Sequence, residues 1–278
     1  MNKKMLSGFL KLSIVVSFLI PGQIFAKTVI MTAPPRESAD AGQKLYGPIA
    51  AHLSKVLGTK VEYQHPENWI AYQRDMRNNK YDIVFDGPHF VSWRMAHLGH
   101  EVLVKLPGNL QFVLLTDAKN NKYNSPNDLI GKKICGISPP NLSTLSVLDH
   151  YRNPVRQPVI KGIKGGMGKV FKSFKGGMCD AAVLRTAFHK KKLTEEQRAG
   201  MKRLYLSKRM PNQAISVSPR LSPQAKREIA KSLTVGDGVA STSGLLKRFG
   251  GKAKSFISAQ NKEYQNYNML LEGVIFGW

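Results

Sequence analysis

The chain has 278 residues, with 42 Lys and Arg against 18 Asp and Glu, which gives a formal net charge of +24. Its length fits one or two domains, and a hydrophobic content of 42% excludes wholesale disorder. Two cysteines exclude a disulfide-rich scaffold and a four-cysteine zinc module. No run reaches about 18 uninterrupted apolar residues, so we expect no membrane span in the mature chain.

The N-terminus has the order of a secretory signal peptide. Three lysines (Lys3, Lys4 and Lys11) precede a short apolar run, residues 12–20, and Ala26 offers a small residue at the cut. We predict a signal peptide over residues 1–26, cleaved after Ala26, and a mature protein beyond the cytoplasmic membrane. The alternative is a buried N-terminal helix.

Export changes the meaning of the basic charge. In a cytosolic protein such charge would first suggest nucleic acid, but here the cations are scattered, with short clusters such as residues 190–192. No nucleic-acid-binding motif accompanies them, so we expect no nucleic-acid partner. A basic surface can instead attract anionic ligands, meet an anionic membrane face, or simply be solvated.

Strands and helices alternate along the first part of the chain. Apolar residues recur at helical spacing up to Leu57, where Gly58 fits a C-terminal cap. The same patterns predict helices over residues 45–57, 69–76 and from 88, and strands over 27–32, 61–63, 81–85 and 112–116. Such alternation implies right-handed crossovers and a mostly parallel sheet.

After a polar loop the alternation restarts, which indicates a second α/β unit. Cys135 and Cys179 lie near neighbouring strands of this unit and could form a disulfide after export or remain buried thiols. The predicted strands are residues 133–137, 158–163, 181–184 and 214–217, and the predicted helices are 141–150, 168–175 and 223–233.

Ligands of open α/β sheets bind beyond the carboxyl ends of strands, and four loops here fit that position. A helix N-terminus in such a loop favours an anion, although hydroxyls there can also act as ordinary caps. The candidate side chains on these loops are Arg36, Asp86, His89, Asn141, Ser143, Thr144 and Arg185.

The sequence does not match motifs for nucleotide binding, metal binding or catalysis. The glycine-rich segment at residues 165–169 has the wrong spacing for a P-loop, and Val170 replaces the required Ser or Thr. His97 and His100 could suggest a metal, but such a pair is more often simply exposed. No catalytic constellation emerges, so we expect no enzyme activity, no metal and no cofactor.

Several short segments match a known family in order and spacing. They are Trp69, residues 82–88, 128–133, 140–144, 179–183 and 211–212. Together they resemble the periplasmic phosphate/phosphite/phosphonate-binding components of ABC importers, over about residues 28–235. The resemblance implies a type II periplasmic binding-protein fold, in which two mixed-sheet α/β lobes close on a ligand around a hinge.

The resemblance also implies domain boundaries. Lobe 1 would comprise residues 27–116 and a return segment, 205–278, and lobe 2 would comprise residues 117–204. The chain would cross between the lobes near residues 116–124 and again near 203–210.

The family's site residues transfer only in part. Its aromatic residue at the start of the second helix falls on Trp69, its pocket tyrosine on Asp86, and its histidine on Met167. Its hydroxyl cradle falls on residues 142–144, where Leu142 lacks a hydroxyl. The two acids that hold the amine of an aminophosphonate fall on Ala187 and Gln213. Arg185 could offset these losses with a bidentate fork.

The implied function is capture of a small anionic solute and its delivery to an ABC permease by a monomeric periplasmic protein. Trp69 and His89 would contact the ligand from lobe 1, and Ser143 and Thr144 would hold oxygens from lobe 2. Two other classes stay open: a receptor that reports ligand to a membrane sensor, and an enzyme using Asp86 and His89.

Overall fold

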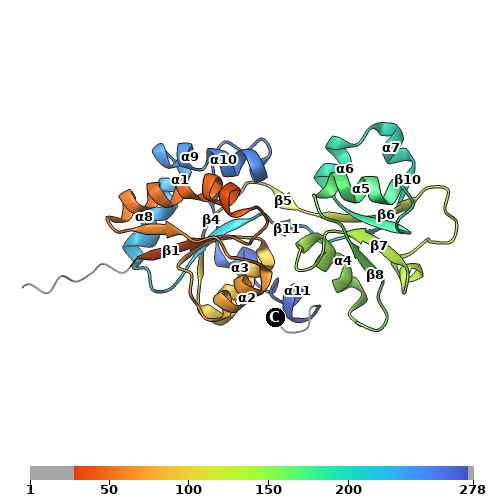
Figure 1. The fold of residues 1–278 in the computed structure, drawn as a ribbon, viewed down its shortest axis with the longest axis horizontal. Coiled ribbons are helices and arrows are strands. Elements are labelled where there is room, and N and C mark those ends of the chain that lie inside the picture. Colours follow the sequence, from red (N-terminus) through yellow and green to blue (C-terminus); the bar gives the residue numbers. More distant parts are fainter. Residues whose placement is uncertain (1–27, 275–278) are drawn as a thin grey trace, which may run out of the picture.

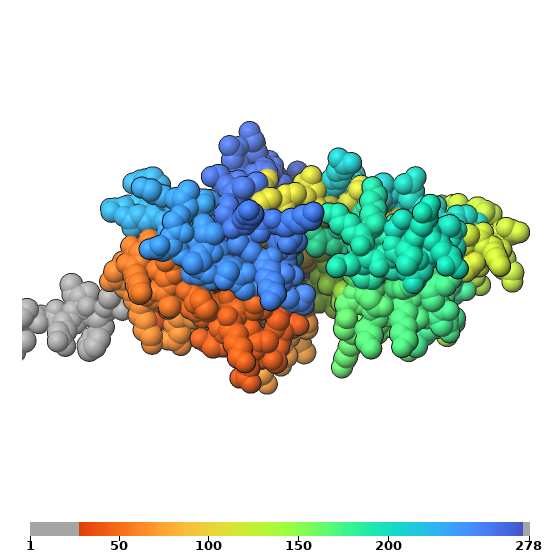
Figure 2. Space-filling model, turned by 90° about the horizontal axis from the view of Figure 1, so that it is seen from above, coloured from red at the N-terminus to blue at the C-terminus, as the bar shows by residue number. Residues whose placement is uncertain are grey.

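The computed structural model describes residues 28–274, which form two α/β bodies side by side (Figure 1). Seen from above, the two bodies are separate masses that meet along a narrow groove (Figure 2). The predicted signal peptide and its cleavage site lie outside the described residues. Within residues 28–274, no helix has the length and apolar character needed to cross a bilayer.

Lobe 1 is built on a six-stranded sheet in the order β13-β4-β12-β3-β1-β2. The strands β1, β2 and β3 run parallel, whereas β12 is antiparallel to both β3 and β4. The strands are β1 (Val29–Thr32), β2 (Val61–Tyr63), β3 (Ile83–Asp86), β4 (Glu101–Lys105), β12 (Ala214–Val217) and β13 (Ile257–Ser258). The helices are α1 (Ala39–Leu57), α2 (Trp69–Arg77), α3 (Pro88–Leu98), α8 (Pro223–Thr234), α9 (Asp237–Ser241), α10 (Ser243–Leu245) and the π-helical η2 (Leu246–Gly250).

The longest helix, α1, shows why the sequence pattern predicts this lobe. The Ser38 side chain caps its N-terminus, and Gly58 ends it with φ 61°, a conformation that glycine adopts without strain. Tyr46, Ile49 and Leu53 follow helical spacing and are fully buried against the sheet.

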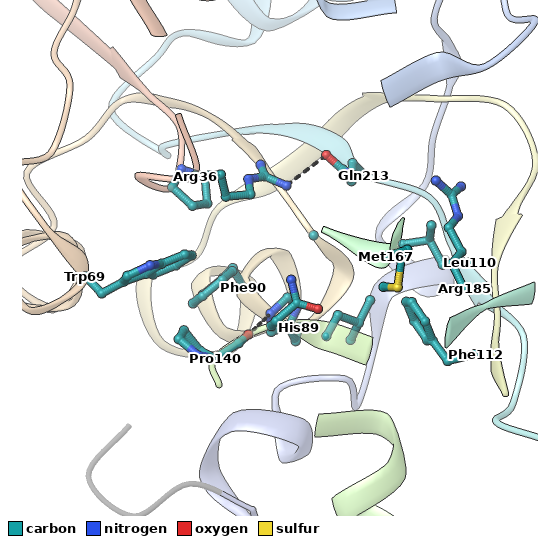
Figure 3. Close-up of a pocket in the computed structure, with 14 residues that line it drawn as sticks. Arg36, Trp69, His89, Phe90, Leu110, Phe112, Pro140, Met167, Arg185 and Gln213 are labelled. Atoms are coloured by element: carbon teal, nitrogen blue, oxygen red, sulfur yellow. Dashed lines mark hydrogen bonds between the residues drawn. The ribbon is translucent and has the colours of Figure 1, made fainter. Parts of the chain in front are cut away.

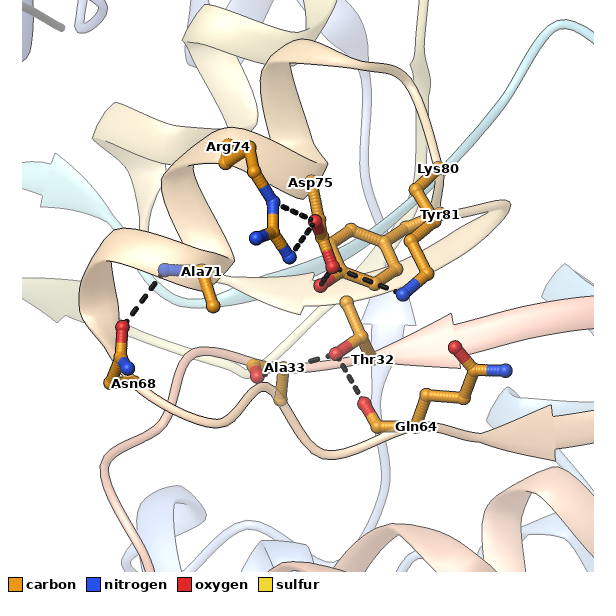
Figure 4. Close-up of polar contacts among 9 residues, drawn as sticks. All are labelled: Thr32, Ala33, Gln64, Asn68, Ala71, Arg74, Asp75, Lys80 and Tyr81. Atoms are coloured by element: carbon orange, nitrogen blue, oxygen red, sulfur yellow. Dashed lines mark hydrogen bonds and ion pairs between the residues drawn. The ribbon is translucent and has the colours of Figure 1, made fainter.

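Helix α2 begins at Trp69 and is fixed at both ends. Figure 4 shows the contacts that fix it. At the N-terminus, Asn68 Oδ1 accepts a hydrogen bond of 2.9 Å from the Ala71 N–H. Near the C-terminus, Asp75 accepts from Arg74 Nε at 2.8 Å and from Lys80 Nζ at 3.0 Å, tying the helix to the segment that enters β3.

Lobe 2 is built on a five-stranded sheet in the order β10-β6-β9-β7-β8. The strands are β6 (Phe112–Asp117), β7 (Lys133–Gly136), β8 (Val159–Gly162), β9 (Ala181–Arg185) and β10 (Met201–Leu206). The helices are η1 (Pro126–Leu129), α4 (Leu142–Tyr151), α5 (Met167–Lys175), α6 (Thr186–Lys192) and α7 (Glu195–Ala199).

Cys135 and Cys179 form a disulfide, which settles the choice that the sequence leaves open. Cys135 lies on β7, and Cys179 lies just before the neighbouring parallel strand β9. The bond therefore joins two central strands within the core of lobe 2.

The chain crosses between the lobes at two short strands, β5 (Asn109–Leu110) and β11 (Met210–Pro211), which pair antiparallel. The predicted first crossing near residues 116–124, and the lobe 1 boundary at residue 116, are wrong. β6 is hydrogen bonded to β9 and β10, so it belongs to lobe 2, and the crossing precedes it. The second crossing, at β11, follows β10 (Met201–Leu206), which is still paired with β6 in the lobe 2 sheet.

The C-terminal segment packs across both lobes. It comprises η3 (Asn261–Tyr264) and α11 (Met269–Glu272), and α11 contacts α3 of lobe 1 and α4 of lobe 2. The Tyr264 hydroxyl donates to the Asn212 carbonyl at 2.6 Å, beside the second crossing. Leu270 and Leu271 are buried in a core that draws on both lobes.

The predicted α/β alternation is confirmed, but a mostly parallel sheet is wrong for both lobes. Antiparallel β12 and β6 each join a sheet from a distant part of the chain, so both sheets are mixed, as the family resemblance implies. The sequence patterns also missed several elements: β4, β10, α6, α7 and the helices after residue 234.

Candidate functional site

A cavity of about 130 Å³ lies between the two lobes, beside the crossing strands (Figure 3). This volume is below the roughly 300–1,000 Å³ of drug-sized pockets, so it suits a small ligand. Its walls are formed by Pro34, Arg36, Trp69, Gly87, His89, Phe90, Leu110, Phe112, Pro140, Asn141, Leu142, Met167, Arg185 and Gln213.

The cavity lies where open α/β sheets place their ligands. The loops after β1 and β3 supply lobe 1 side chains, including Arg36 and His89. In lobe 2, the start of α4 and the carboxyl end of β9 supply Asn141 and Arg185. All four loops predicted from the sequence therefore reach one cavity.

Arg36 brings a largely buried positive charge to the lobe 1 wall. Its Nη1 donates to Gln213 Oε1 at 3.1 Å, and its guanidinium lies 4.9 Å from the centre of the Phe249 ring. Its Nε and Nη2 are buried, and neither has a hydrogen-bond partner among the described residues. These two groups can therefore donate to an anion.

Arg185 brings a second positive charge from lobe 2, at the end of β9. Its Nε is buried and has no hydrogen-bond partner within residues 28–274. Burial lowers the pKa of its guanidinium, since desolvation penalises the charged form. An anion in the cavity would reduce this penalty.

Of the described residues, no Asp or Glu lines this cavity. Asp86 is fully buried and turned away, because Arg94 Nε donates to it at 2.9 Å and the Tyr72 hydroxyl at 2.6 Å. Glu37, which follows Arg36, lies 3.5 Å from Arg248 Nε. Asp86 thus has a cation of its own, whereas both Glu37 oxygens are buried without a hydrogen-bond partner among the described residues. Because neither carboxylate is in the wall, the two arginines leave the cavity positive.

His89 links the lobes as a neutral ring. Burial lowers its pKa to about 3, with the Arg36 charge adding to the effect. Its Nε2 lies 3.0 Å from the Pro140 carbonyl, which can only accept, so the proton is on Nε2. His89 Nδ1 is then an acceptor, buried and without a partner in the described part of the chain.

An apolar floor completes the cavity. Trp69 stacks on Phe90 with ring centres 6.2 Å apart and an interplanar angle of 18°. Leu110, Phe112 and Met167 line the same space from the crossing and lobe 2. The cavity thus combines two cations with apolar walls.

The polar side chains at the start of α4 form hydrogen bonds with neighbouring residues of lobe 2. Asn141 Oδ1 accepts from the Ser143 N–H at 3.0 Å and from the Ser143 hydroxyl at 2.7 Å. The Thr144 hydroxyl donates to the Ile137 carbonyl. The N–H of Leu142, at the first helical position, has no intrahelical acceptor and remains the donor of this helix end.

The structure brings most of the predicted site residues together. Six of the nine line the cavity: Arg36, Trp69, His89, Asn141, Arg185 and Gln213. Asp86, Ser143 and Thr144 are fully buried behind the wall and hold it in place. The wall residues that the prediction lacked are mainly apolar: Phe90 directly follows His89, and Leu110 and Phe112 flank the crossing.

The two histidines considered for a metal have other surroundings. His97 pairs with Glu272, and His100 is buried. Within residues 28–274, no group of three or more His, Cys, Asp or Glu side chains could hold a metal ion.

Comparison with known proteins agrees with this architecture. Residues 31–264 match the model of a family described as "ABC transporter, phosphonate, periplasmic substrate-binding protein". The chain belongs to this phosphonate-binding family. The resemblance read from the sequence is therefore confirmed, and so is the fold of two mixed-sheet lobes.

The individual proteins that this chain resembles are distant in sequence. The phosphate-import protein PhnD of Mycolicibacterium smegmatis is 27% identical over 128 residues, which cover 43% of this chain and only 39% of that protein. PhnD1 from Prochlorococcus marinus in complex with methylphosphonate superposes with a TM-score of 0.62 at 18% identity, over 88% of this chain and 97% of that chain. XAC2383 from Xanthomonas citri bound to chloride gives a TM-score of 0.68 at 13% identity, over 89% and 97% of the two chains. These two structures share the fold.

Proposed function

We propose that this family member is the solute-capturing component of an ABC importer and binds a small phosphonate- or phosphate-like anion between its lobes. The observation that carries the proposal is the cavity with an arginine on each lobe and, among the described residues, no carboxylate in its wall. The names of the relatives support the ligand class, since one is a phosphate-import protein and another holds methylphosphonate.

Binding would act through closure of the lobes. Arg36 and Gln213 contact the ligand from lobe 1, and Arg185, Asn141 and the Leu142 N–H contact it from lobe 2. A ligand that touches both lobes favours the closed state by its differential affinity, and β5 and β11 are the segments that bend. The closed form is what the permease would recognise.

The remaining parts of the proposal follow from the sequence. The chain is exported to the periplasm, cleaved after Ala26, and acts as a monomer with an ABC permease as partner. It binds without turning over its ligand and uses no cofactor. Trp69 and His89 shape the ligand site, while Asp86, Ser143 and Thr144 support its walls.

Thermal unfolding of the mature chain with a panel of anions tests this function. A ligand at 100 times its Kd adds about 2.7 kcal/mol, which raises the midpoint by about 5–10 °C at this size. We expect this rise with phosphate, phosphite or a phosphonate, its loss in Arg36→Gln, and its retention in Arg227→Gln, an exposed arginine on α8. Failure of every anion to raise the midpoint, or an equal rise in Arg36→Gln, contradicts the proposal.

A further inference from the structure

The two cavity arginines are separate centres of positive charge. Figure 3 shows their guanidinium groups on opposite sides of the cavity, with Gln213 and Met167 in the space between them. Arg36 Nε and Nη2 and Arg185 Nε are all buried, and none has a hydrogen-bond partner in the described part of the chain. A buried donor on a cation is costly to leave unpaired, so each arginine indicates an anionic partner of its own.

Among the described residues, no acidic side chain lines the cavity to serve as that partner. Glu37 pairs with Arg248, and Asp86 pairs with Arg94 inside lobe 1. At Arg185, burial lowers the pKa of the guanidinium, and an anionic neighbour would oppose that effect. With no carboxylate in the described part of the cavity wall, an anionic ligand is suited to supply the partners.

The lobes already touch beside the cavity, which bears on how many anionic groups the ligand carries. The His89 Nε2–H donates across the lobe boundary to the Pro140 carbonyl at 3.0 Å. Figure 3 shows the two guanidinium groups on opposite sides of the cavity, so a ligand with an anionic group at each end can meet both of them while the lobes stay in contact. Leu110, Phe112 and Met167 add apolar surface to the wall of the same cavity.

We propose that the ligand carries two anionic groups joined by a short apolar linker, a phosphonate and a second acid such as a carboxylate, with one group at Arg36 and the other at Arg185. The small cavity, about 130 Å³, limits the linker to a few carbons. This inference rests on the proposed function and narrows its ligand from phosphonates in general to acid-substituted phosphonates.

A matched pair of probes isolates the second charge. Phosphonoacetate and phosphonoacetamide have nearly the same shape, but the amide replaces the carboxylate with a neutral group. Isothermal titration calorimetry would give Kd for both probes and for methylphosphonate, in the mature wild-type chain and in Arg36→Gln, Arg185→Gln and Arg227→Gln. Circular dichroism and the unfolding midpoint of each variant establish that it is folded.

We expect the wild-type chain to bind phosphonoacetate about 10- to 100-fold more tightly than phosphonoacetamide, the range for a hydrogen bond to a charged group. This ratio should fall below about threefold in one of the two cavity variants and stay unchanged in Arg227→Gln. The variant that loses the ratio identifies the arginine that meets the carboxylate.

Three results overturn the inference, and they differ in what they say of the proposed function. If methylphosphonate binds and the wild-type chain shows no preference for phosphonoacetate over its amide, the ligand has one anionic group and the proposed function stands. The same holds if the preference survives in both cavity variants. If none of the three phosphonates binds, the proposed function fails with the inference. The wild-type ratio decides the question even where a variant does not fold.

Discussion

Replacement of Asp86 by Asn separates a structural role for this residue from a role in ligand binding. Asp86 and Arg94 have fully buried side chains and form an ion pair at 2.9 Å. The Tyr72 hydroxyl also donates to Asp86, and Arg94 Nη2 donates to that hydroxyl at 2.9 Å. Asn keeps the shape of the side chain but removes its charge and one acceptor, which leaves Arg94 as an uncompensated buried cation.

The size of the effect follows from that burial. Removing one partner of a buried ion pair destabilises a protein by about 3–5 kcal/mol. In a protein of about 250 residues each kcal/mol shifts the midpoint by about 2–4 °C, so Asp86→Asn should unfold about 6–20 °C lower. Because Asp86 does not line the cavity, the Kd of a bound phosphonate measured well below the transition should change less than about threefold.

Urea unfolding and calorimetry together measure both quantities. Asp40→Asn is the matched control, because Asp40 is exposed in the first turn of α1 and should cost no more than about 1 kcal/mol. The reasoning is refuted if Asp86→Asn is as stable as the control but binds phosphonate at least tenfold more weakly. Asp86 would then face the ligand, as its alignment with the family's pocket tyrosine suggests.

Three further perturbations test other parts of the structure. Replacing Cys135 and Cys179 by Ala removes the cross-link between two residues with a sequence separation of 44. Urea titration should show a free energy of unfolding lower by about 4 kcal/mol, and a loss under 1 kcal/mol would contradict the disulfide. Burial lowers the pKa of His100 to about 2, against about 6.5 when unfolded, so the unfolded chain gains the proton and stability is lost as the pH falls below 6.5. His100→Gln should reduce the slope of unfolding free energy against pH by about 1.4 kcal/mol per pH unit between pH 6 and 4. An unchanged slope would show that His100 is not buried in its neutral form. Replacing Ser143 and Thr144 by Ala should lower stability by about 1–3 kcal/mol with less than a threefold change in phosphonate Kd, whereas a tenfold loss of affinity would put their hydroxyls in contact with the ligand.

Local patterns predicted most of the elements but not how distant segments pair. The spacing of apolar residues identifies α1, and alternation identifies β2, because each pattern reflects burial of one face. The strand β6 was also predicted, yet assigned to the wrong lobe. Its place in the sheet depends on antiparallel pairing with β9 and β10, about 70 to 90 residues later in the chain, and no local pattern records that choice.

Site residues could be predicted from the sequence where their place at the carboxyl end of a strand brings them to the cavity. Arg36 follows β1, His89 lies at the start of the helix after β3, and Arg185 ends β9, and the topology brings these strand ends to one cavity. Side-chain direction was not predictable. Asp86 ends β3 as a plausible ligand, but it pairs with Arg94 on the following helix, a contact that depends on the packing of α3.

At Gln213 this chain departs from the family pattern, and the departure affects the charge of the pocket. The resemblance aligns Gln213 with an acid that would hold the amine of an aminophosphonate. Here the Gln213 amide oxygen accepts a hydrogen bond from Arg36 Nη1 at 3.1 Å and so holds the Arg36 guanidinium in place. In the family pattern, an acid at this position would instead bind the ligand's amine. A protonated amine placed there would meet Arg36 and be repelled.

This inversion makes a prediction about selectivity. The mature chain should bind 2-aminoethylphosphonate at least about tenfold more weakly than phosphonoacetate, because Arg36 repels the amine and attracts the acid. Gln213→Glu would pair with Arg36, cancel its charge and reduce this preference, while Gln224→Glu, an exposed substitution on α8, should leave it unchanged. Tighter binding of the aminophosphonate by the wild-type chain would mean that Arg36 does not face the ligand. The expected weaker binding would agree with a site in which Gln213, in place of the acid that the family resemblance implies, orients Arg36 toward the ligand.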